Sequence, residues 1–203
     1  MSTNYVITIG RQFGSLGRDI GKMLAKELDI HYYDRDLLEK SAETMGIPLG
    51  NLTNYDETLG GSFTKMLYPL GLGSATTHNK LFEHQKSMIL DLAKNQSCVI
   101  VGRCADYILR DNKNVLSVFI YAPYKHRLWN SIHRLGLYND EAEKMIERVD
   151  KAREAYHKYY TTTSSKGLEN RNLLIDSSML PLEGTVAVLK DIAVRKFGLE
   201  NEE

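Results

Sequence analysis

The chain has 203 residues, of which 42% are hydrophobic and 26% are charged, a composition typical of a globular protein and not of a disordered or fibrous one. Its 26 basic and 26 acidic residues cancel, so the chain has no overall field to hold a nucleic acid backbone or an anionic membrane surface. Any anion site must therefore be local. We expect a single domain over residues 1–203.

Cysteine use and the opening segment indicate where the protein works. Cys98 and Cys104 are too few for a disulfide framework or a cysteine-based zinc site. No apolar run approaches the ~20 residues of a membrane span, and the chain opens on a strand-like segment instead of a signal peptide. These features predict a cytoplasmic protein with no nucleic acid and no membrane partner.

The first half of the chain alternates strand and helix patterns. A short β-branched run at Tyr5–Ile9, closed by Gly10, predicts a strand buried on both faces. Apolar residues from Leu16 to Leu28 recur every three or four positions and predict an amphipathic helix. A second strand, a second helix and a stretch without clear pattern follow, at residues 30–33, 37–45 and 50–78.

The second half continues the alternation. We predict a helix near residues 81–92, further strands and a closing helix, at residues 98–101, 115–121, 173–176 and 182–197. Two helical faces lie between the later strands; they comprise Leu128, Trp129, Ile132 and Leu135, and then Ala142, Met145, Ile146 and Val149. Short buried strands joined by helices predict an α/β fold with a parallel sheet of about five strands flanked by helices.

A glycine-rich stretch separates the first strand from the first helix, where a P-loop holds phosphates with backbone N–H groups and a helix N-terminus. Against the pattern G-x-x-x-x-G-K-[ST], Gln12 replaces the first glycine and Gly17 is retained. Arg18 stands for the lysine and Asp19 for the hydroxyl residue. We predict that donor phosphates are bound by Gln12, Phe13, Gly14, Ser15, Leu16, Gly17, Arg18 and Asp19.

These departures leave two interpretations open. Arginine can bridge phosphate oxygens through its planar fork, whereas the anionic Asp19 would either recruit magnesium or repel the nucleotide. Alternatively, Gly10, Gly14 and Gly17 merely permit a tight turn from strand to helix.

Three segments together resemble the cytidylate kinase-like family, a relative of bacterial cytidylate kinase among the P-loop nucleoside monophosphate kinases. They are ITIGRQFGSLGRDIGKMLAKELDIHYYDRDLLEK, CVIVGRCADYIL and LLIDSS, at residues 7–40, 98–109 and 173–178. The resemblance implies a three-layer P-loop NTPase fold with a monophosphate-binding insertion at about 41–95 and a helical lid at about 123–166. It also implies ATP and magnesium.

The resemblance also implies roles for residues that follow the second and third strands. Asp34 matches an aspartate at the acceptor site, where it could orient the acceptor or hold magnesium through water, and Arg35 follows it. Arg103 matches an arginine that binds the acceptor phosphate. Cys104 replaces an aspartate associated with reading cytosine, and Asp106 lies two positions on. Asp34 could instead cap the following helix.

In the lid of this family, arginines close over the donor phosphates. Arg127 and Arg153 are the candidates in this chain, although a solvated helix face with acidic neighbours is the alternative for each. An aromatic cluster could stack a nucleobase or pack a helix against the sheet; it comprises Tyr156, His157, Tyr159 and Tyr160.

The resemblance and the loop together lead to two functional hypotheses. The first is transfer of the γ-phosphoryl group of ATP to a nucleoside monophosphate, with CMP or dCMP as the first guess, or to a related small acceptor. Arg18, Asp34, Arg103, Arg127 and Arg153 would carry the catalysis, and magnesium would reach Asp19 or Asp34. The second is a nucleotide- or phosphate-binding module without kinase activity. Exposed helices could support a homodimer in either case.

Overall fold

The computed structural model describes residues 4–34, 75–164, 167–168 and 170–199. Its strands are β1 (Val6–Arg11), β2 (His31–Tyr33), β3 (Cys98–Val101), β4 (Val115–Tyr121) and β5 (Leu173–Asp176). Its helices are α1 (Gly17–Glu27), α4 (Ala75–Asn95), α5 (Ala105–Ile108), α6 (Tyr124–His133), α7 (Asn139–Thr161) and α8 (Leu182–Phe197). None of these helices combines the length and the apolar content needed to cross a bilayer.

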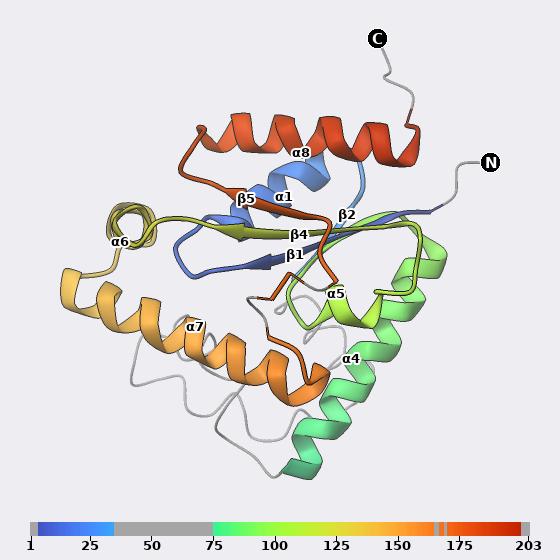
Figure 1. Cartoon of the computed structure of the whole chain (residues 1–203), viewed down its shortest axis with the longest axis horizontal. Helices are drawn as coiled ribbons and strands as arrows, with labels where there is room; N and C mark the ends of the chain where they lie inside the picture. The colour runs from blue at the N-terminus through green and yellow to red at the C-terminus, as the bar shows by residue number, and fades with distance from the viewer. Residues whose placement is uncertain (1–3, 35–74, 165–166, 169, 200–203) are drawn as a thin grey trace.

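The strands form one parallel sheet in the order β2-β3-β1-β4-β5. Helices α1 and α8 pack together over one face, while α4 and α5 lie on the other side (Figure 1). The fold is therefore the predicted α/β fold with five parallel strands between helical layers. In such sheets ligands bind in the crevice at the carboxyl ends of the strands, so a ligand site is expected at the turns after β1, β2 and β3.

Strands buried on both faces explain the apolar runs in the sequence. Alternate residues of β1 point to opposite faces: Ile7 and Ile9 join the cluster under α1 and α8, and Val6 joins the cluster under α4 and α5. A third apolar cluster lies apart from these two, between Phe13 of the glycine-rich loop and buried residues of α7. The loop and the predicted lid therefore share a core.

Three details differ from the sequence-based expectations. Gly10 does not end β1, which continues to Arg11; a Cβ at Gly10 would lie 2.7 Å from the Phe119 ring, so this glycine makes room for a neighbouring strand. The short helix α5 was not predicted. The proposed apolar face around Leu128 is wrong in part, since Trp129 is 52% exposed and Leu135 lies beyond the end of α6. The predicted helix at 37–45 and residues 50–74 of the stretch at 50–78 lie outside the described residues. Residues 75–78 of that stretch belong to α4.

Candidate phosphate-binding site

The turn between β1 and α1 has a backbone suited to an anion. Gly14 has φ 75° and Leu16 has φ 60°, and left-handed residues in a turn bring neighbouring N–H groups to one side, as in an anion-binding nest. Among the described residues, no hydrogen bond uses the amide N–H of Gly14, Ser15, Leu16 or Gly17. Unused N–H groups at the start of a helix carry partial positive charge. The loop is therefore a concave, electropositive turn.

Left-handed backbone also occurs at the turn after β3, the strand that neighbours β1. Arg103 and Cys104 both have φ 56°, directly after Gly102 with φ 84°. Left-handed backbone at non-glycine residues such as these costs of order ~1–3 kcal/mol and is retained mainly at functional sites. Two adjacent strands thus end in strained turns at the same edge of the sheet.

Hydrogen bonds from α6 and α7 hold the loop in place. The N–H of Phe13 donates to Asp150 at 2.7 Å, and the other oxygen of Asp150 accepts from Arg127 at 2.7 Å. Arg127 also donates to the carbonyl oxygens of Phe13, at 3.2 Å, and of Ala122, at 3.1 Å. Through these bonds Arg127 and Asp150 tie Phe13 to α6 and α7, so Arg127 positions the loop.

The remaining loop groups bond to one another, to the residue after β4 and to α6. The N–H of Ala122 donates to the side-chain oxygen of Gln12 at 3.2 Å, and the buried Ser15 hydroxyl donates to the carbonyl of Gln12 at 2.9 Å. The side-chain amide of Asn130 donates to the carbonyl of Gly14 at 2.8 Å. The loop carbonyls and side chains are therefore engaged, while the N–H groups of residues 14–17 are not.

Asp34 and Arg18 form an ion pair beside the loop. The Arg18 guanidinium lies 2.7 Å from the Asp34 carboxylate, whose side chain is 6% exposed while that of Arg18 is 53% exposed. Tyr32 donates a hydrogen bond to the same carboxylate at 3.2 Å, and burial together with the Asp34 charge raises the pKa of Tyr32. Asp19, the other predicted magnesium contact, is exposed on the first turn of α1. Arg35 lies outside the described residues.

The turn after β3 carries a buried arginine. Arg103 is 8% exposed, and its guanidinium carbon lies 5.4 Å from the centre of the Tyr156 ring of α7. Arg153, also on α7, donates to the backbone carbonyl of Arg11 at 3.2 Å. Cys104 is buried, and burial, followed by the Asp106 charge, raises the pKa of its thiol, so it is not a reactive thiolate.

Asp106 is engaged inside the protein. It lies 3.3 Å from the His157 ring and 3.7 Å from Arg171. Burial alone would raise the pKa of Asp106, but the His157 hydrogen bond and the charges of His157 and Arg171 lower it overall. Burial alone would lower the pKa of His157, but the same hydrogen bond raises it. A role for Asp106 in reading a base stays a prediction.

The aromatic residues of α7 pack against α4. Tyr160 stacks on Phe82 with ring centres 3.9 Å apart, and Tyr156 meets the edge of the same ring. Tyr159 is 62% exposed. Packing, one of the two alternatives left by the sequence, therefore accounts for Tyr156 and Tyr160.

One residue at the centre of the site was missed. Arg11, the last residue of β1, runs alongside Gly17, where an added Cβ would lie 2.6 Å from its own Cβ. Its guanidinium lies over Gly102, where an added Cβ would overlap it. Arg11 therefore sits between the turn after β1 and the turn after β3. Its position directly before the loop could have revealed it. That position was overlooked because Gly10 was expected to end the strand.

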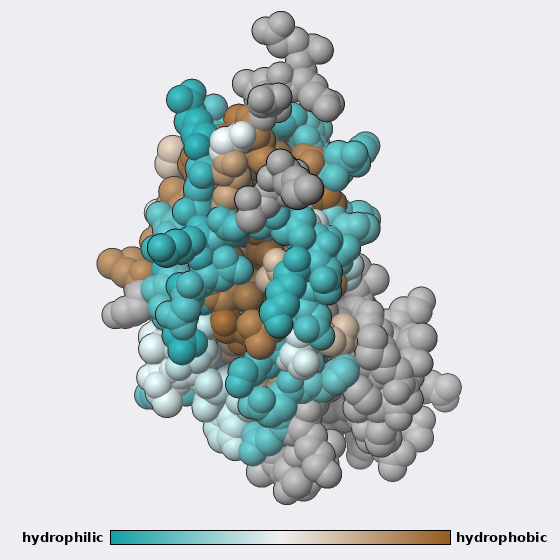
Figure 2. All heavy atoms as spheres, turned by 90° about the vertical axis from the view of Figure 1, so that its right-hand side faces the viewer, coloured by the Kyte–Doolittle hydropathy of each residue, from teal (hydrophilic) through white to brown (hydrophobic). Residues whose placement is uncertain are grey.

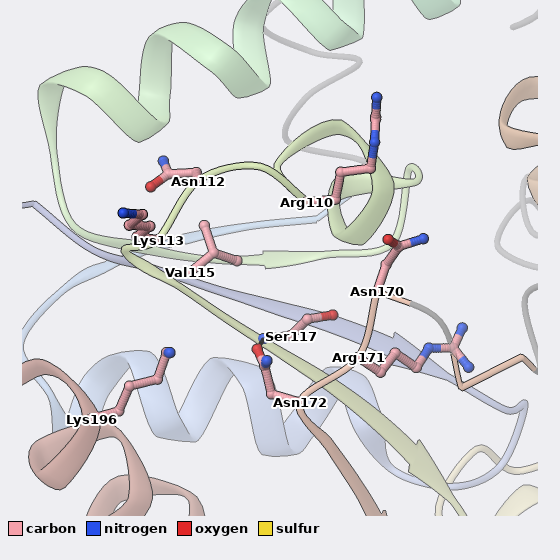
Figure 3. A pocket seen from close by; sticks show the side chains of 9 residues that line it. All are labelled: Arg110, Asn112, Lys113, Val115, Ser117, Asn170, Arg171, Asn172 and Lys196. Carbon is pink, nitrogen blue, oxygen red and sulfur yellow. Dashed lines mark hydrogen bonds between the residues drawn. The ribbon is translucent and has the colours of Figure 1, made fainter.

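A second pocket lies at the opposite end of the sheet. It has a volume of about 380 Å³ and is lined by Arg110, Asn112, Lys113, Val115, Ser117, Asn170, Arg171, Asn172 and Lys196. Figure 3 shows that the guanidinium groups of Arg110 and Arg171 point away from its centre. The surface at the end of the molecule where β1 begins is mostly hydrophilic around exposed apolar atoms (Figure 2). The loop after β1 thus remains the best candidate site.

Comparison with known proteins identifies the family. Residues 6–179 match the profile of the cytidylate kinase-like family. The chain belongs to this family. No match was found among curated protein sequences. Within the described residues, no group of three or more His, Cys, Asp or Glu side chains could hold a metal ion by itself.

Solved structures show the same fold. An uncharacterized protein from Eubacterium ventriosum ATCC 27560 is 24% identical, with a TM-score of 0.73 over 94% of this chain and 98% of that one. A shikimate kinase from Acinetobacter baumannii, in complex with shikimate, is 13% identical, with a TM-score of 0.52 over 98% and 97%. A gluconokinase from Sinorhizobium meliloti 1021 is 12% identical, with a TM-score of 0.51 over 98% and 94%. The likeness shows that small-molecule kinases use this fold.

Proposed function

We propose that this member of the cytidylate kinase-like family transfers the γ-phosphoryl group of ATP to a small phosphorylated acceptor, with CMP or dCMP as the first candidate. The observation that carries the proposal is the concave turn at residues 14–17, whose N–H groups have no acceptor among the described residues and which lies beside several arginines. Backbone amides at a helix start suit phosphate oxygens. Membership of the family supports this reaction class.

Donor binding would use the loop and α1. The free N–H groups fit a phosphate chain, because they are the donors that a phosphate needs and no side chain competes for them. Asp34 and Asp19 are the carboxylates beside the loop that fit magnesium, which would enter with the nucleotide. Bound there, ATP supplies the phosphoryl group and magnesium offsets part of its charge. Arg18, now paired with Asp34, would orient that carboxylate.

Acceptor binding would use the turn after β3. Arg103 is fixed by a strained backbone and contacts the Tyr156 ring, so its planar fork is preorganised for a phosphate. Positioning of this kind removes much of the entropic barrier to transfer between two bound reactants. Arg153 approaches from the lid side through its bond to the Arg11 carbonyl and would face charge that develops during transfer.

A transfer assay tests the proposal. Purified chain is incubated with ATP, magnesium and a panel of nucleoside monophosphates, and ADP formation is followed. We expect acceptor-dependent ADP with at least one monophosphate, and Arg103→Ala should lower kcat/KM by roughly 100-fold, the usual effect of losing a charge-stabilising donor. Arg110→Ala is the matched control, since Arg110 lies at the second pocket and its loss should leave the rate unchanged.

The alternative, a binding module without kinase activity, gives a different pattern. Nucleotides would then raise the melting temperature, because a ligand that binds only the folded state stabilises it, but no acceptor would yield ADP. That pattern would contradict transfer while retaining the phosphate site.

A further inference from the structure

The backbone of the loop suggests a different register for the P-loop pattern. Leu16 has the left-handed conformation that glycine adopts without strain, and α1 begins at the next residue, Gly17. If Leu16 occupies the place of the second glycine of the pattern, Gly17 occupies the place of the lysine and Arg11 that of the first glycine. In this register the first residue of α1 has no side chain with which to bind phosphate.

Arg11 is placed to fill this gap. Its stem lies against Gly17, the residue without a side chain, and its guanidinium lies over Gly102 at the neighbouring turn. Glycine is favoured at both places: an added Cβ at Gly17 would collide with the Arg11 Cβ, and Gly102 has φ 84°. The residue keeps part of its surface exposed, so a ligand in the crevice can reach it.

Two other arginines act on the Arg11 side chain, together with Tyr32 and Asp34. No hydrogen bond or ion pair joins its side chain to any other residue within the described ranges. Its pKa is held well below the ordinary value, first by burial and then by the charges of Arg153 and Arg103, which outweigh the opposing effects of Tyr32 and Asp34. Arg18 differs, since it is paired with Asp34 at 2.7 Å.

We propose that Arg11 supplies the phosphate-binding cation that a P-loop ordinarily takes from its lysine, and that it contacts the phosphate chain of the donor nucleotide. This inference rests on the proposed function, because it assigns the donor site to the same loop. It requires that the guanidinium fork bind two phosphate oxygens at once, which a lysine cannot do with the same geometry.

Calorimetric binding of ADP and of inorganic pyrophosphate tests the role of Arg11 without requiring turnover. Arg11→Met keeps most of the stem but removes the charge, Arg11→Lys keeps a charge without the fork, and Arg18→Met is the matched control. We expect Arg11→Met to weaken pyrophosphate binding by roughly 10- to 100-fold, the worth of one charge-assisted contact. Arg11→Lys should bind with intermediate affinity, and Arg18→Met should lose less than Arg11→Met.

The melting temperature without ligand separates a binding role from a structural one. A lowered pKa means that the charged guanidinium is less stable in the folded protein than in the unfolded chain. The melting temperature of Arg11→Met should therefore be no lower than that of the wild type. If Arg11→Met binds pyrophosphate with a dissociation constant within twofold of the wild-type value, the inference is overturned and the proposed function stands. Failure of the wild type to bind either ligand overturns both.

Discussion

Arg127 and Arg11 both contact the loop after β1, Arg127 at Phe13 and Arg11 at Gly17, but their surroundings differ. Arg127 donates to two backbone carbonyls and to the Asp150 carboxylate, which in turn accepts from the N–H of Phe13. The Arg11 side chain has no such acceptor among the described residues, and two other arginines lie near it. An arginine that donates to three acceptors of the protein holds the structure together, whereas an arginine beside unused amides and like charges suits an anion.

The largest effect expected from this comparison is on stability. Asp150→Asn removes the charge that pairs with the buried Arg127 and weakens the acceptor for the Phe13 amide. Breaking one partner of a buried ion pair typically costs about 3–5 kcal/mol, so the free energy of unfolding in urea should fall by an amount of this order. Lys190→Met, which breaks the exposed pair with Glu27, should change it by less than about 1 kcal/mol. Equal losses in the two variants would contradict a structural role for Arg127.

A smaller effect is expected when the loop backbone is changed. Gly14 has φ 75° and an added Cβ would lie 2.6 Å from the Arg127 carbonyl oxygen, whereas Gly136 has φ 72° with nothing within 4 Å. Gly136→Ala should therefore show the backbone strain alone, about 1 kcal/mol. Gly14→Ala should lower the free energy of unfolding by about 1–3 kcal/mol more than Gly136→Ala, because of the added clash. It should also weaken pyrophosphate binding. Similar unfolding free energies for the two variants would show that the loop is not packed against α6 as described.

The smallest effect concerns pH. The raised pKa of His157 means that its contribution to stability is complete below the ordinary value of 6.5 and is lost as pH rises through the raised value. The lowered pKa of Asp106 means that its contribution is complete above 3.8 and is lost as pH falls through the lowered value. The difference in melting temperature between wild type and His157→Gln should thus be largest between about pH 4 and 6.5 and shrink above it. A difference that stays constant from pH 5 to 9 would contradict a charged pair.

The elements of this fold were predictable because their signals are local. Residues Cys98–Val101 form β3 with the predicted bounds. The apolar face predicted for α7 is also buried, with Val149 fully so. Helix α5 has only 4 residues, too few to show a helical period. The exposure of Trp129 also could not be read from spacing, because large apolar side chains are common on surfaces.

The candidate site was only partly predictable. The loop and Arg103 follow from the order of strand, glycines and helix, together with the family resemblance. Arg11 was missed because Gly10 was taken as the end of the strand. Gly10 instead leaves room for the Phe119 ring on a neighbouring strand. Arg127 was expected to close over the donor phosphates, but its partners Phe13 and Asp150 are 114 and 23 positions away in the chain. Contacts of this kind depend on the tertiary fold and leave no local pattern.

The most direct test of the account is an NMR titration of the ¹⁵N-labelled chain with pyrophosphate and with ADP. If the turn after β1 binds phosphate, the amide signals of Gly14, Ser15, Leu16 and Gly17 should move downfield on saturation, as expected for N–H groups that gain a charged acceptor. Saturation of the chain with either ligand while these four signals stay in place, and signals elsewhere move, would contradict it.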